Sequence, residues 1–284
     1  VGVVPVDAPG GDDPVGVVVL AGPTDVVHDA VAALVAAGVS FSATAQERKS
    51  YPTPEGHPLS EVISGYEFRT KETQALQDDD FENPGFLWVD EGEELWSTAE
   101  GTAGKACADC HNDASESMKM VGATFPKWNE KAGKPLNVEL QVNMCRTENM
   151  GAEPWKYESR QMIAMTSYVK TQARGEPVNV DFSAGDMQKW QDRGKELYYT
   201  RTGQLDLSCA SCHEENYGNM IRADHLSQGQ INGFPAYRLK NAKLNGVHSR
   251  FKGCIRDTRA ETYSPGSDEF VALELYVTSR GNGL

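Results

Sequence analysis

The feature that most constrains this chain is a five-residue motif, Cys-x-x-Cys-His, which occurs twice. The two copies consist of Cys107, Cys110 and His111, and of Cys209, Cys212 and His213. This motif is the attachment signature of a c-type haem. Its two thiols reach the vinyl groups on one edge of the porphyrin, and the next residue turns its imidazole to the iron. A zinc site or a redox Cys-x-x-Cys would not need a His directly after each pair. The sequence therefore predicts two covalently bound haem c groups.

The residues around the two motifs form an internal repeat. In front of the motifs, Gly92-Glu93-Glu94-Leu95-Trp96 matches Gly194-Lys195-Glu196-Leu197-Tyr198 without gaps. Behind them, Phe125-Pro126 stands as far before Cys145 as Phe234-Pro235 stands before Cys254. Apolar residues at helical spacing within 162–169 and 270–277 predict a closing helix for each half. A helix carrying Leu and an aromatic residue before the motif is typical of a class I cytochrome c.

We therefore expect a mainly α-helical protein with two class I cytochrome c-like domains in tandem and an extended N-terminal wrapping segment. The expected parts are a wrapping segment at 46–91, domains at 92–175 and 186–284, and a linker at 176–185. The wrapping segment contains four prolines and one short helix expected within 64–76. Residues 1–45 include a small, apolar run that ends in Ala43-Thr44-Ala45, the pattern of a signal-peptidase site. No Lys or Arg precedes that run, and we expect a leader-like or disordered segment with no part in the fold.

The charge of the chain limits its partners. The net charge is −14, from 41 acidic and 27 basic residues. This disfavours nucleic acid and anionic membranes, which both attract basic surfaces. After the leader-like segment, no apolar run approaches the roughly 20 residues of a membrane span. Because c-type haem is normally attached outside the cytoplasmic membrane, we expect an exported, periplasmic protein.

Two cysteines lie outside the motifs, Cys145 and Cys254. One interpretation is a disulfide between them, as in proteins of oxidising compartments. The other is axial ligation of the iron opposite each motif His. The other candidate ligands are Met144 and Met150 in the first half, and His225 and His248 in the second. Because the repeat aligns Cys145 with Cys254, we favour Cys in both halves. An anionic thiolate stabilises ferric iron, so both haems are expected to have low potentials.

Basic residues gather around only one of these cysteines. Those within six residues of Cys254 are His248, Arg250, Lys252, Arg256 and Arg259. One interpretation is that they neutralise the haem propionates and the thiolate. The other is that they bind a small oxyanion through charge-assisted hydrogen bonds. Since Cys145 has only Arg146 close by in the sequence, we expect the second domain to be the working one.

Together these features resemble the SoxA family of dihaem cytochromes in bacterial thiosulfate oxidation. The resemblance runs from about residue 50 to the end of the chain. It depends on both haem motifs, the two partner cysteines, and the stretch His248-Ser-Arg-Phe-Lys-Gly-Cys254-Ile-Arg-Asp-Thr-Arg259-Ala. It implies the axial ligands His111 and Cys145 for one haem, and His213 and Cys254 for the other. It further implies a catalytic pair, Arg250 and Cys254, with a sulfane sulfur on Cys254 as a persulfide. Lys252, Arg259 and His248 are additional candidates for substrate binding.

The resemblance also implies a reaction and partners. Members of the family join thiosulfate oxidatively to a cysteine of the carrier protein SoxYZ, as an L-cysteine S-thiosulfotransferase, and two electrons pass to a cytochrome c. The monohaem cytochrome SoxX completes the heterodimer. The main alternative is a low-potential dihaem electron carrier without catalysis. A dihaem peroxidase would need an open or easily vacated iron site, and a purely structural subunit would not need the basic cluster.

Overall fold

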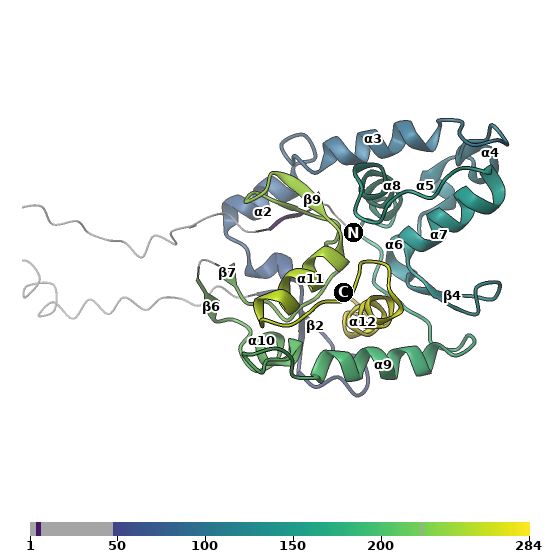
Figure 1. Cartoon of the computed structure of the whole chain (residues 1–284). Helices are drawn as coiled ribbons and strands as arrows, with labels where there is room; N and C mark the ends of the chain where they lie inside the picture. Colours follow the sequence, from purple (N-terminus) through teal and green to yellow (C-terminus); the bar gives the residue numbers. More distant parts are fainter. Residues whose placement is uncertain (1–3, 7–47, 223) are drawn as a thin grey trace, which may run out of the picture.

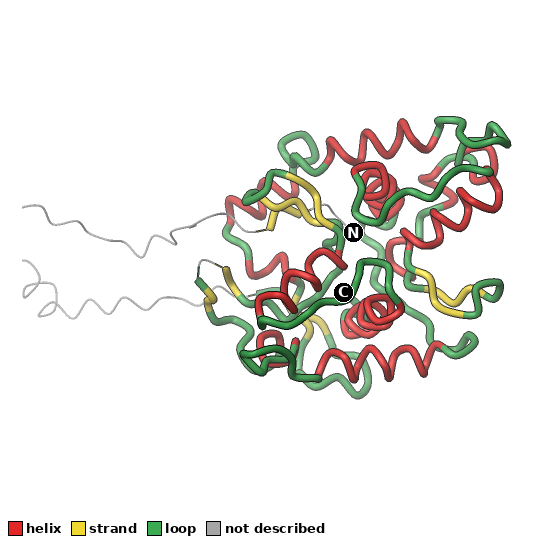
Figure 2. The backbone as a smooth tube through the Cα atoms, viewed as in Figure 1, coloured by secondary structure: helices red, strands yellow, loops and turns green. Residues whose placement is uncertain are grey.

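The computed structural model describes residues 4–6, 48–222 and 224–284. Most of the regular structure is helical, and the two halves of the chain repeat one arrangement of helices and a hairpin (Figures 1 and 2). The prediction of a mainly α-helical tandem repeat is therefore confirmed. The elements of the first half are α3 (Phe86–Trp96), α4 (Ala108–His111), α5 (Ala114–Ser117), α6 (Val121–Thr124), β4 (Lys127–Asn129), β5 (Lys134–Leu136), α7 (Val138–Cys145), η2 (Arg146–Met150) and α8 (Arg160–Thr171). Those of the second half are α9 (Met187–Tyr199), α10 (Cys209–His213), β6 (Met220–Ile221), β7 (Asp224–His225), β8 (Ala236–Arg238), β9 (Lys243–Asn245), α11 (Val247–Asp257) and α12 (Asp268–Arg280).

In each half, the helix before the haem motif crosses the closing helix at a glycine. Gly194 of α9 lies against α12, where an added Cβ would stand 2.0 Å from the carbonyl oxygen of Ala272. Gly92 of α3 lies against α8 in the same way, 2.4 Å from the carbonyl oxygen of Ala164. A contact this close between two backbones excludes any side chain larger than hydrogen. The glycine at the start of each predicted repeat is therefore required by the crossing of the two helices.

A two-stranded hairpin leads into the cysteine-bearing helix of each half. Strands β4 and β5 pair antiparallel, and so do β8 and β9. Helix α7 follows the first hairpin and ends at Cys145, and α11 follows the second and contains Cys254. Phe251 of α11 packs edge-on against Phe270 of α12, with ring centroids 5.8 Å apart. The hairpin and this packing hold the cysteine-bearing helix against the closing helix.

The segment before α3 lies on the second half before the chain enters the first. It comprises β2 (Ser50–Tyr51), β3 (Val62–Ile63), η1 (Gly65–Phe68) and α2 (Lys71–Asp78). The amide of Ile63 donates to the buried side chain of Gln228 at 2.8 Å, and Ser64 and Asn232 hydrogen-bond through their side chains. The expected wrapping is therefore present. Two helical stretches, η1 and α2, occur where one was expected, and α3 begins at Phe86, inside the segment predicted to be extended.

Part of the predicted leader-like segment is included in a sheet. Residues Val4–Val6 form β1, which pairs parallel with β8. For these three residues the expectation of no part in the fold is wrong, because their backbone supplies a third strand to the β8–β9 hairpin. The remainder of 1–45 lies outside the described residues, so the leader-like character of that stretch stays a prediction.

The stretch predicted as a linker contacts both halves. The amide of Asn179 donates to the carbonyl of Ala123 in the first half at 2.8 Å. Val178 exchanges backbone hydrogen bonds with Leu284 and Gly283 at the C-terminus, at 3.0 and 2.8 Å. Val178 and Val180, the alternating apolar residues of the linker, are both buried. Backbone hydrogen bonds and the burial of two valine side chains therefore hold the linker against both halves.

A buried polar cluster also joins the halves. The side-chain amide of Asn137, in the first half, donates to Oε2 of Glu274 in α12 at 2.7 Å. The same carboxylate oxygen lies 2.9 Å from Nε2 of His248 in α11. Tyr157, from the first half, stacks on the His248 ring with centroids 5.1 Å apart. Because buried polar groups are costly unless they find partners, this cluster favours one arrangement of the two halves.

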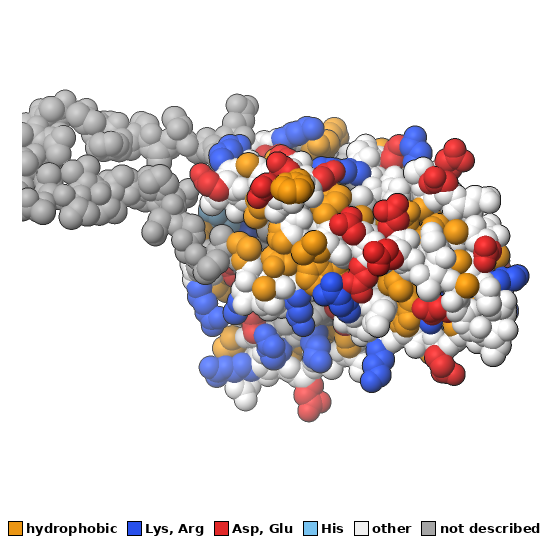
Figure 3. Space-filling view, turned by 90° about the horizontal axis from the view of Figure 1, so that it is seen from above, with side chains coloured by type: hydrophobic (Ala, Val, Ile, Leu, Met, Phe, Trp, Pro, Cys, Tyr) orange, Lys and Arg blue, Asp and Glu red, His pale blue; other side chains and the backbone are white. Residues whose placement is uncertain are grey.

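The surface carries both charges in separate groups. Figure 3 shows Lys and Arg side chains gathered at the lower left of the viewed face, and Asp and Glu side chains near its centre. The net charge of −14 therefore does not exclude locally basic surface. No helix within the described ranges is long and apolar enough to cross a membrane.

Gly194→Ala is expected to lower the free energy of unfolding by about 1–3 kcal/mol or more, because α9 and α12 would have to move apart. The measurement is urea unfolding of the haem-loaded protein, followed by circular dichroism. The control is Gly253→Ala, also inside a helix, where an added Cβ meets nothing within 4 Å. This control should keep or slightly raise stability, since Ala favours helix over Gly. Equal stability of the two variants would contradict the role assigned to the crossing.

Candidate haem sites and an arginine pocket

The second Cys-x-x-Cys-His motif forms a short helix with a capping box. Ser208 precedes α10, its hydroxyl accepts from the amide of Ser211 at 3.3 Å, and its own amide donates to the Ser211 hydroxyl at 3.2 Å. Such reciprocal bonds satisfy amides that the start of a helix leaves unpaired. The motif therefore begins its helical turn at Cys209, which places the two thiols and His213 on successive turns of one backbone.

The His213 ring is held in the orientation needed for metal ligation. Its Nδ1 lies 2.7 Å from the backbone carbonyl of Ser227, which can only accept, so Nδ1 carries the proton. Nε2 is then the nitrogen left for a metal, as is common for metal-bound histidine. Burial lowers the pKa of His213, which keeps the imidazole in the neutral form that binds iron. Gly229 makes room for the ring, because an added Cβ would lie 2.9 Å from Cγ of His213.

The first motif is held by an aromatic residue of the helix before it. Trp96, in the last turn of α3, donates from its indole nitrogen to the carbonyl of Asn112 at 3.0 Å. Its ring lies 5.8 Å from the ring of His111, centroid to centroid. The tryptophan in the predicted repeat thus connects the crossing helix to the residues that would hold the first haem.

Each cysteine outside the motifs lies close to the motif of its own half. Burial raises the pKa of Cys107, and the negative charge of Cys145 raises it further. Likewise, burial raises the pKa of Cys209 to about 12, with the charge of Cys254 as the next cause. All six cysteines lie within the described residues and are free thiols. The structure therefore shows no Cys145–Cys254 disulfide and brings each cysteine to a different motif.

These residues fit a covalently attached haem. Each half supplies a thiol pair, a His directly after it, and a further thiol near the pair. Two thioether links and an imidazole are the attachment set of a c-type haem, and a thiolate is an established axial ligand. A bound haem would supply a one-electron acceptor at each site.

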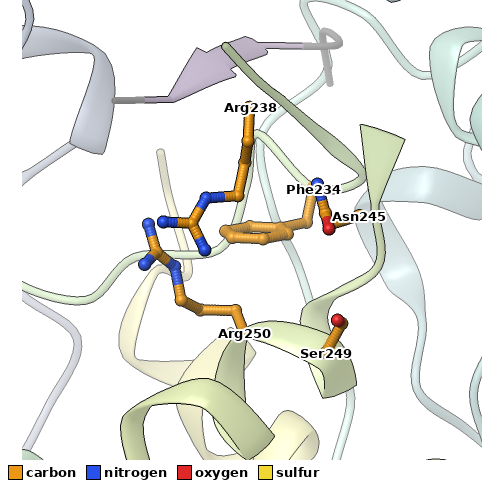
Figure 4. Close-up of a pocket in the computed structure, with 5 residues that line it drawn as sticks. All are labelled: Phe234, Arg238, Asn245, Ser249 and Arg250. Atoms are coloured by element: carbon orange, nitrogen blue, oxygen red, sulfur yellow. The ribbon is translucent and has the colours of Figure 1, made fainter. Parts of the chain in front are cut away.

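A pocket lies on the second half, beside the start of α11 (Figure 4). It is a small hollow open to solvent, and its lining consists of Phe234, Arg238, Asn245, Ser249 and Arg250. Arg250 stands four residues before Cys254 on α11, so the two side chains share one face of the helix. Burial by surrounding protein raises the pKa of Cys254 even though its side chain keeps contact with solvent. The charges of Arg250 and Arg238 act in the opposite direction and favour the thiolate.

His248 is not part of this pocket, contrary to the prediction that it helps to bind a substrate. It precedes Arg250 by two residues on α11 and therefore points about 200° away around the helix. Its ring is fully buried, and its Nδ1 accepts from the amide of Gly266 at 2.9 Å. The prediction placed His248 beside Cys254 because the two residues are close in the sequence. In the helix, however, the His248 side chain points into the contact between the two halves.

Lys252 and Arg259 are exposed and do not line the pocket. Lys252 follows Arg250 by two residues and so lies on another face of α11. Arg259 comes after the helix, which ends at Asp257. Of the predicted substrate-binding residues, the structure thus places only Arg250 in the pocket, one helical turn from Cys254.

The sequence interpretation missed Arg238, on strand β8. It is distant from Cys254 in the chain, and the β8–β9 hairpin brings it to the start of α11. The repeat carried a signal for it, because the alignment that matches Cys145 with Cys254 also matches the neutral Asn129 with Arg238. A charge that appears in only one copy of a repeat marks a position where the two copies differ in chemistry.

Comparisons with known proteins agree with this geometry. The family model described as SoxA/TsdA, cytochrome c domain, matches residues 91–178 and 193–284. A relative from Pseudaminobacter salicylatoxidans, named L-cysteine S-thiosulfotransferase subunit SoxA, is 57% identical over 231 residues, covering 81% of each chain. The protein of that name from Paracoccus pantotrophus is 52% identical, covering 78% of this chain and 76% of the relative. A crystal structure of SoxXA from P. pantotrophus superposes with a TM-score of 0.79 at 49% identity, covering 84% of this chain and 90% of that chain.

Gly229→Ala is expected to displace the His213 imidazole and to change the low-spin ferric signal of one haem in electron paramagnetic resonance. Gly218→Ala is the matched control, because both glycines have positive φ, +78° and +86°, while an added Cβ at 218 meets nothing within 4 Å. Both variants carry similar backbone strain, so only the contact with His213 distinguishes them. Identical signals in the two variants would show that Gly229 does not hold the ring in place.

Proposed function

The chain belongs to the SoxA/TsdA cytochrome c family, and from that membership we propose that it is the dihaem subunit of an L-cysteine S-thiosulfotransferase. The observation that carries the proposal is the pairing of Arg250 with Cys254 on one face of α11, at the edge of a basic pocket. A guanidinium offers paired donors to the oxygens of an oxyanion, and a thiolate beside it offers a nucleophile.

The proposed reaction joins thiosulfate to a cysteine of a sulfur-carrier protein, SoxYZ. The carrier thiolate and the sulfane sulfur of thiosulfate form a new sulfur–sulfur bond, which gives a cysteine S-thiosulfonate. Two electrons leave in this step, and ferric cytochrome c groups accept them one at a time. Thiosulfate is a dianion, so the charges of Arg250 and Arg238 offset its repulsion from a thiolate.

We further propose that Cys254 is the first acceptor of the thiosulfate group. Its thiolate would bond to the sulfane sulfur as two electrons leave. The carrier thiolate would then attack that sulfur and release the Cys254 thiolate. This route suits a thiolate that has a cationic side chain one turn away and keeps contact with solvent. Cys145 occupies the equivalent position in the first half, where the neutral Gln141 stands one turn before it, so we assign that half to structure or electron relay.

The proposal includes two haem c groups, one per half. Cys107 and Cys110 would hold the first and Cys209 and Cys212 the second, with axial ligands His111, Cys145, His213 and Cys254. The partner is a monohaem cytochrome, SoxX, since the matched crystal structure is of a SoxXA complex. The protein would work in the periplasm, where c-type haem attachment takes place.

The haem number is tested by intact-protein mass spectrometry. The wild-type chain should carry the mass of two haems, and the Cys107→Ala, Cys110→Ala double variant should carry one. The Cys209→Ala, Cys212→Ala variant should also carry one, with a different spectrum. A wild-type chain that carries a single haem after maturation in a haem-attaching host would contradict the proposal.

Conjugation is tested with the purified haem-loaded complex, thiosulfate, the carrier protein and ferric cytochrome c. Wild-type complex should add a thiosulfonate to the carrier, seen as a mass increase, and should reduce cytochrome c. Cys254→Met should lower this rate by at least about 100-fold, because a thioether cannot accept the sulfur. The matched control is Cys145→Met, the same change at the equivalent position of the repeat, which should keep most of the activity.

The outcomes separate the candidate functions. No conjugate from wild-type complex would leave the non-catalytic dihaem electron carrier as the function. A normal conjugate from Cys254→Met would keep the transferase but restrict Cys254 to setting the properties of the haem. Activity lost equally in both Met variants would show that ligand replacement itself, rather than loss of a nucleophile, stops the reaction.

A further inference from the structure

The two cysteine-bearing helices begin with different capping residues. When Cys145 is aligned with Cys254, the residue before α7, Asn137, corresponds to Gly246 before α11. Asn137 caps its own helix, because its Oδ1 accepts from the amide of Leu140 at 3.1 Å. A side-chain acceptor at this place satisfies an amide that the first turn of a helix leaves unpaired. Gly246 has no side chain, so the first turn of α11 needs an acceptor from elsewhere.

Glu158, in the first half, supplies that acceptor. Its Oε2 accepts from the amide of Gly246 and its Oε1 from the amide of Ser249, both at 3.1 Å. Ser249 is the repeat equivalent of Leu140, so the same amide is capped in both halves, once locally and once by the other half. An added Cβ at Gly246 would stand 2.5 Å from Oε1 of Glu158, so the glycine leaves the space that the carboxylate occupies. A carboxylate at this end of a helix also interacts favourably with the helix dipole.

The backbone of Glu158 indicates that its side chain is needed there. Its φ is +63°, in the left-handed region that is unfavourable for a residue with a Cβ. Glu158 directly precedes Ser159, the N-cap of α8. The equivalent residue of the second half, before the N-cap of α12, is Gly266, with a φ of +84°. Glycine adopts this conformation readily. The first half therefore has a glutamate at a position that suits glycine, and the carboxylate accepts two hydrogen bonds that a glycine could not.

The capped turn carries residues of the proposed conjugation site. Ser249 and Arg250 project from the first turn of α11 and line the pocket shown in Figure 4. The amide of Arg250 donates to the carbonyl of Gly246 at 3.3 Å, which closes that turn, and Cys254 follows one turn later. Burial raises the pKa of Glu158, and the hydrogen bonds from the two amides oppose this. Removing the carboxylate would therefore loosen the turn that places Arg250 and Cys254.

We propose that Glu158 is a positioning residue: by capping α11 from the first half, it holds Arg250 and Cys254 in the geometry that conjugation requires. This inference rests on the proposed function, because only that function gives α11 a reaction to serve. It also gives the first half a part in the chemistry that does not depend on its haem. The first half supplies the cap for the helix that bears the proposed nucleophile.

The test compares haem-loaded complexes of three variants, Glu158→Gly, Gly246→Asn and the double variant. Glu158→Gly removes the cap and relieves the backbone, so it should lower kcat/KM for thiosulfate by about 10-fold, as for loss of one cap. It should also change the low-spin ferric signal that Gly229→Ala alters, which belongs to the second haem, and leave the other signal unchanged. Adding Gly246→Asn gives α11 the local cap of the first half and should restore both. Gly246→Asn alone should instead impair both, because its Cβ meets the carboxylate of Glu158.

The control is Ala242→Gly, in the turn between β8 and β9. Ala242 is exposed and has a φ of +50°, so this change relieves a backbone like that of Glu158 without removing a cap. It should leave both readouts as in the wild type. Glu158→Gln keeps one acceptor oxygen in place of two and loses the charge. It should give an intermediate effect, and it replaces Glu158→Gly in the comparison if that variant does not fold.

Two results would overturn the inference. One is a wild-type ferric signal and kcat/KM in both Glu158→Gly and Glu158→Gln. The other is a loss that Gly246→Asn fails to restore, because the glutamate would then stabilise the contact between the halves in general rather than cap α11. The ferric signal reports on the cap even if the wild-type complex forms no conjugate, so failure of the proposed function is distinguishable from failure of this inference.

Discussion

The crossing of helices at Gly92 and Gly194 is the constraint on which the rest of the structure depends. Because the backbones of α9 and α12 touch at Gly194, the start of α10 is fixed relative to α12. Helix α11 also packs on α12, through Phe251 and Phe270. The helix before the motif and the helix that carries Cys254 are therefore both positioned against α12. A larger side chain at the crossing would shift one set of ligands relative to the other.

At the contact between the halves, equivalent positions of the repeat carry different residues. Glu139 and His248 stand at equivalent positions, each six residues before the partner cysteine, and both are buried near Glu274. Burial raises the pKa of Glu139 to about 7, with the negative charge of Glu274 as the next cause. Although burial opposes it, the neighbouring His248 and Asn137 side chains lower the pKa of Glu274. One of the two buried carboxylates is thus ionised with partners, while the other is held closer to its neutral form.

The fold could be predicted because local patterns determine it, whereas the haem ligands stay a prediction. A haem motif has a fixed spacing, and a repeat is detected from the constant offset between its two copies. The tandem domains could therefore be predicted from the sequence. The orientation of residues on α11 did not follow, because the helix start at Val247 decides which side chains face inward. Sequence distance therefore suggested that His248 lies beside Cys254, whereas its side chain is buried in the contact between the two halves. Arg238 was missed because only the pairing of β8 with β9 brings it to Arg250.

The two halves share one backbone arrangement but differ in the side chains near the partner cysteine. The hairpin, the cysteine-bearing helix and the crossing helices are shared by both halves, so the difference lies in a few side chains around the cysteine. In the first half, the neutral amides of Asn129 and Gln141 satisfy one another and need no ligand. In the second, the guanidinium groups of Arg238 and Arg250 line one pocket. The two halves therefore differ in the charge of the side chains near the partner cysteine, although their backbones follow one arrangement.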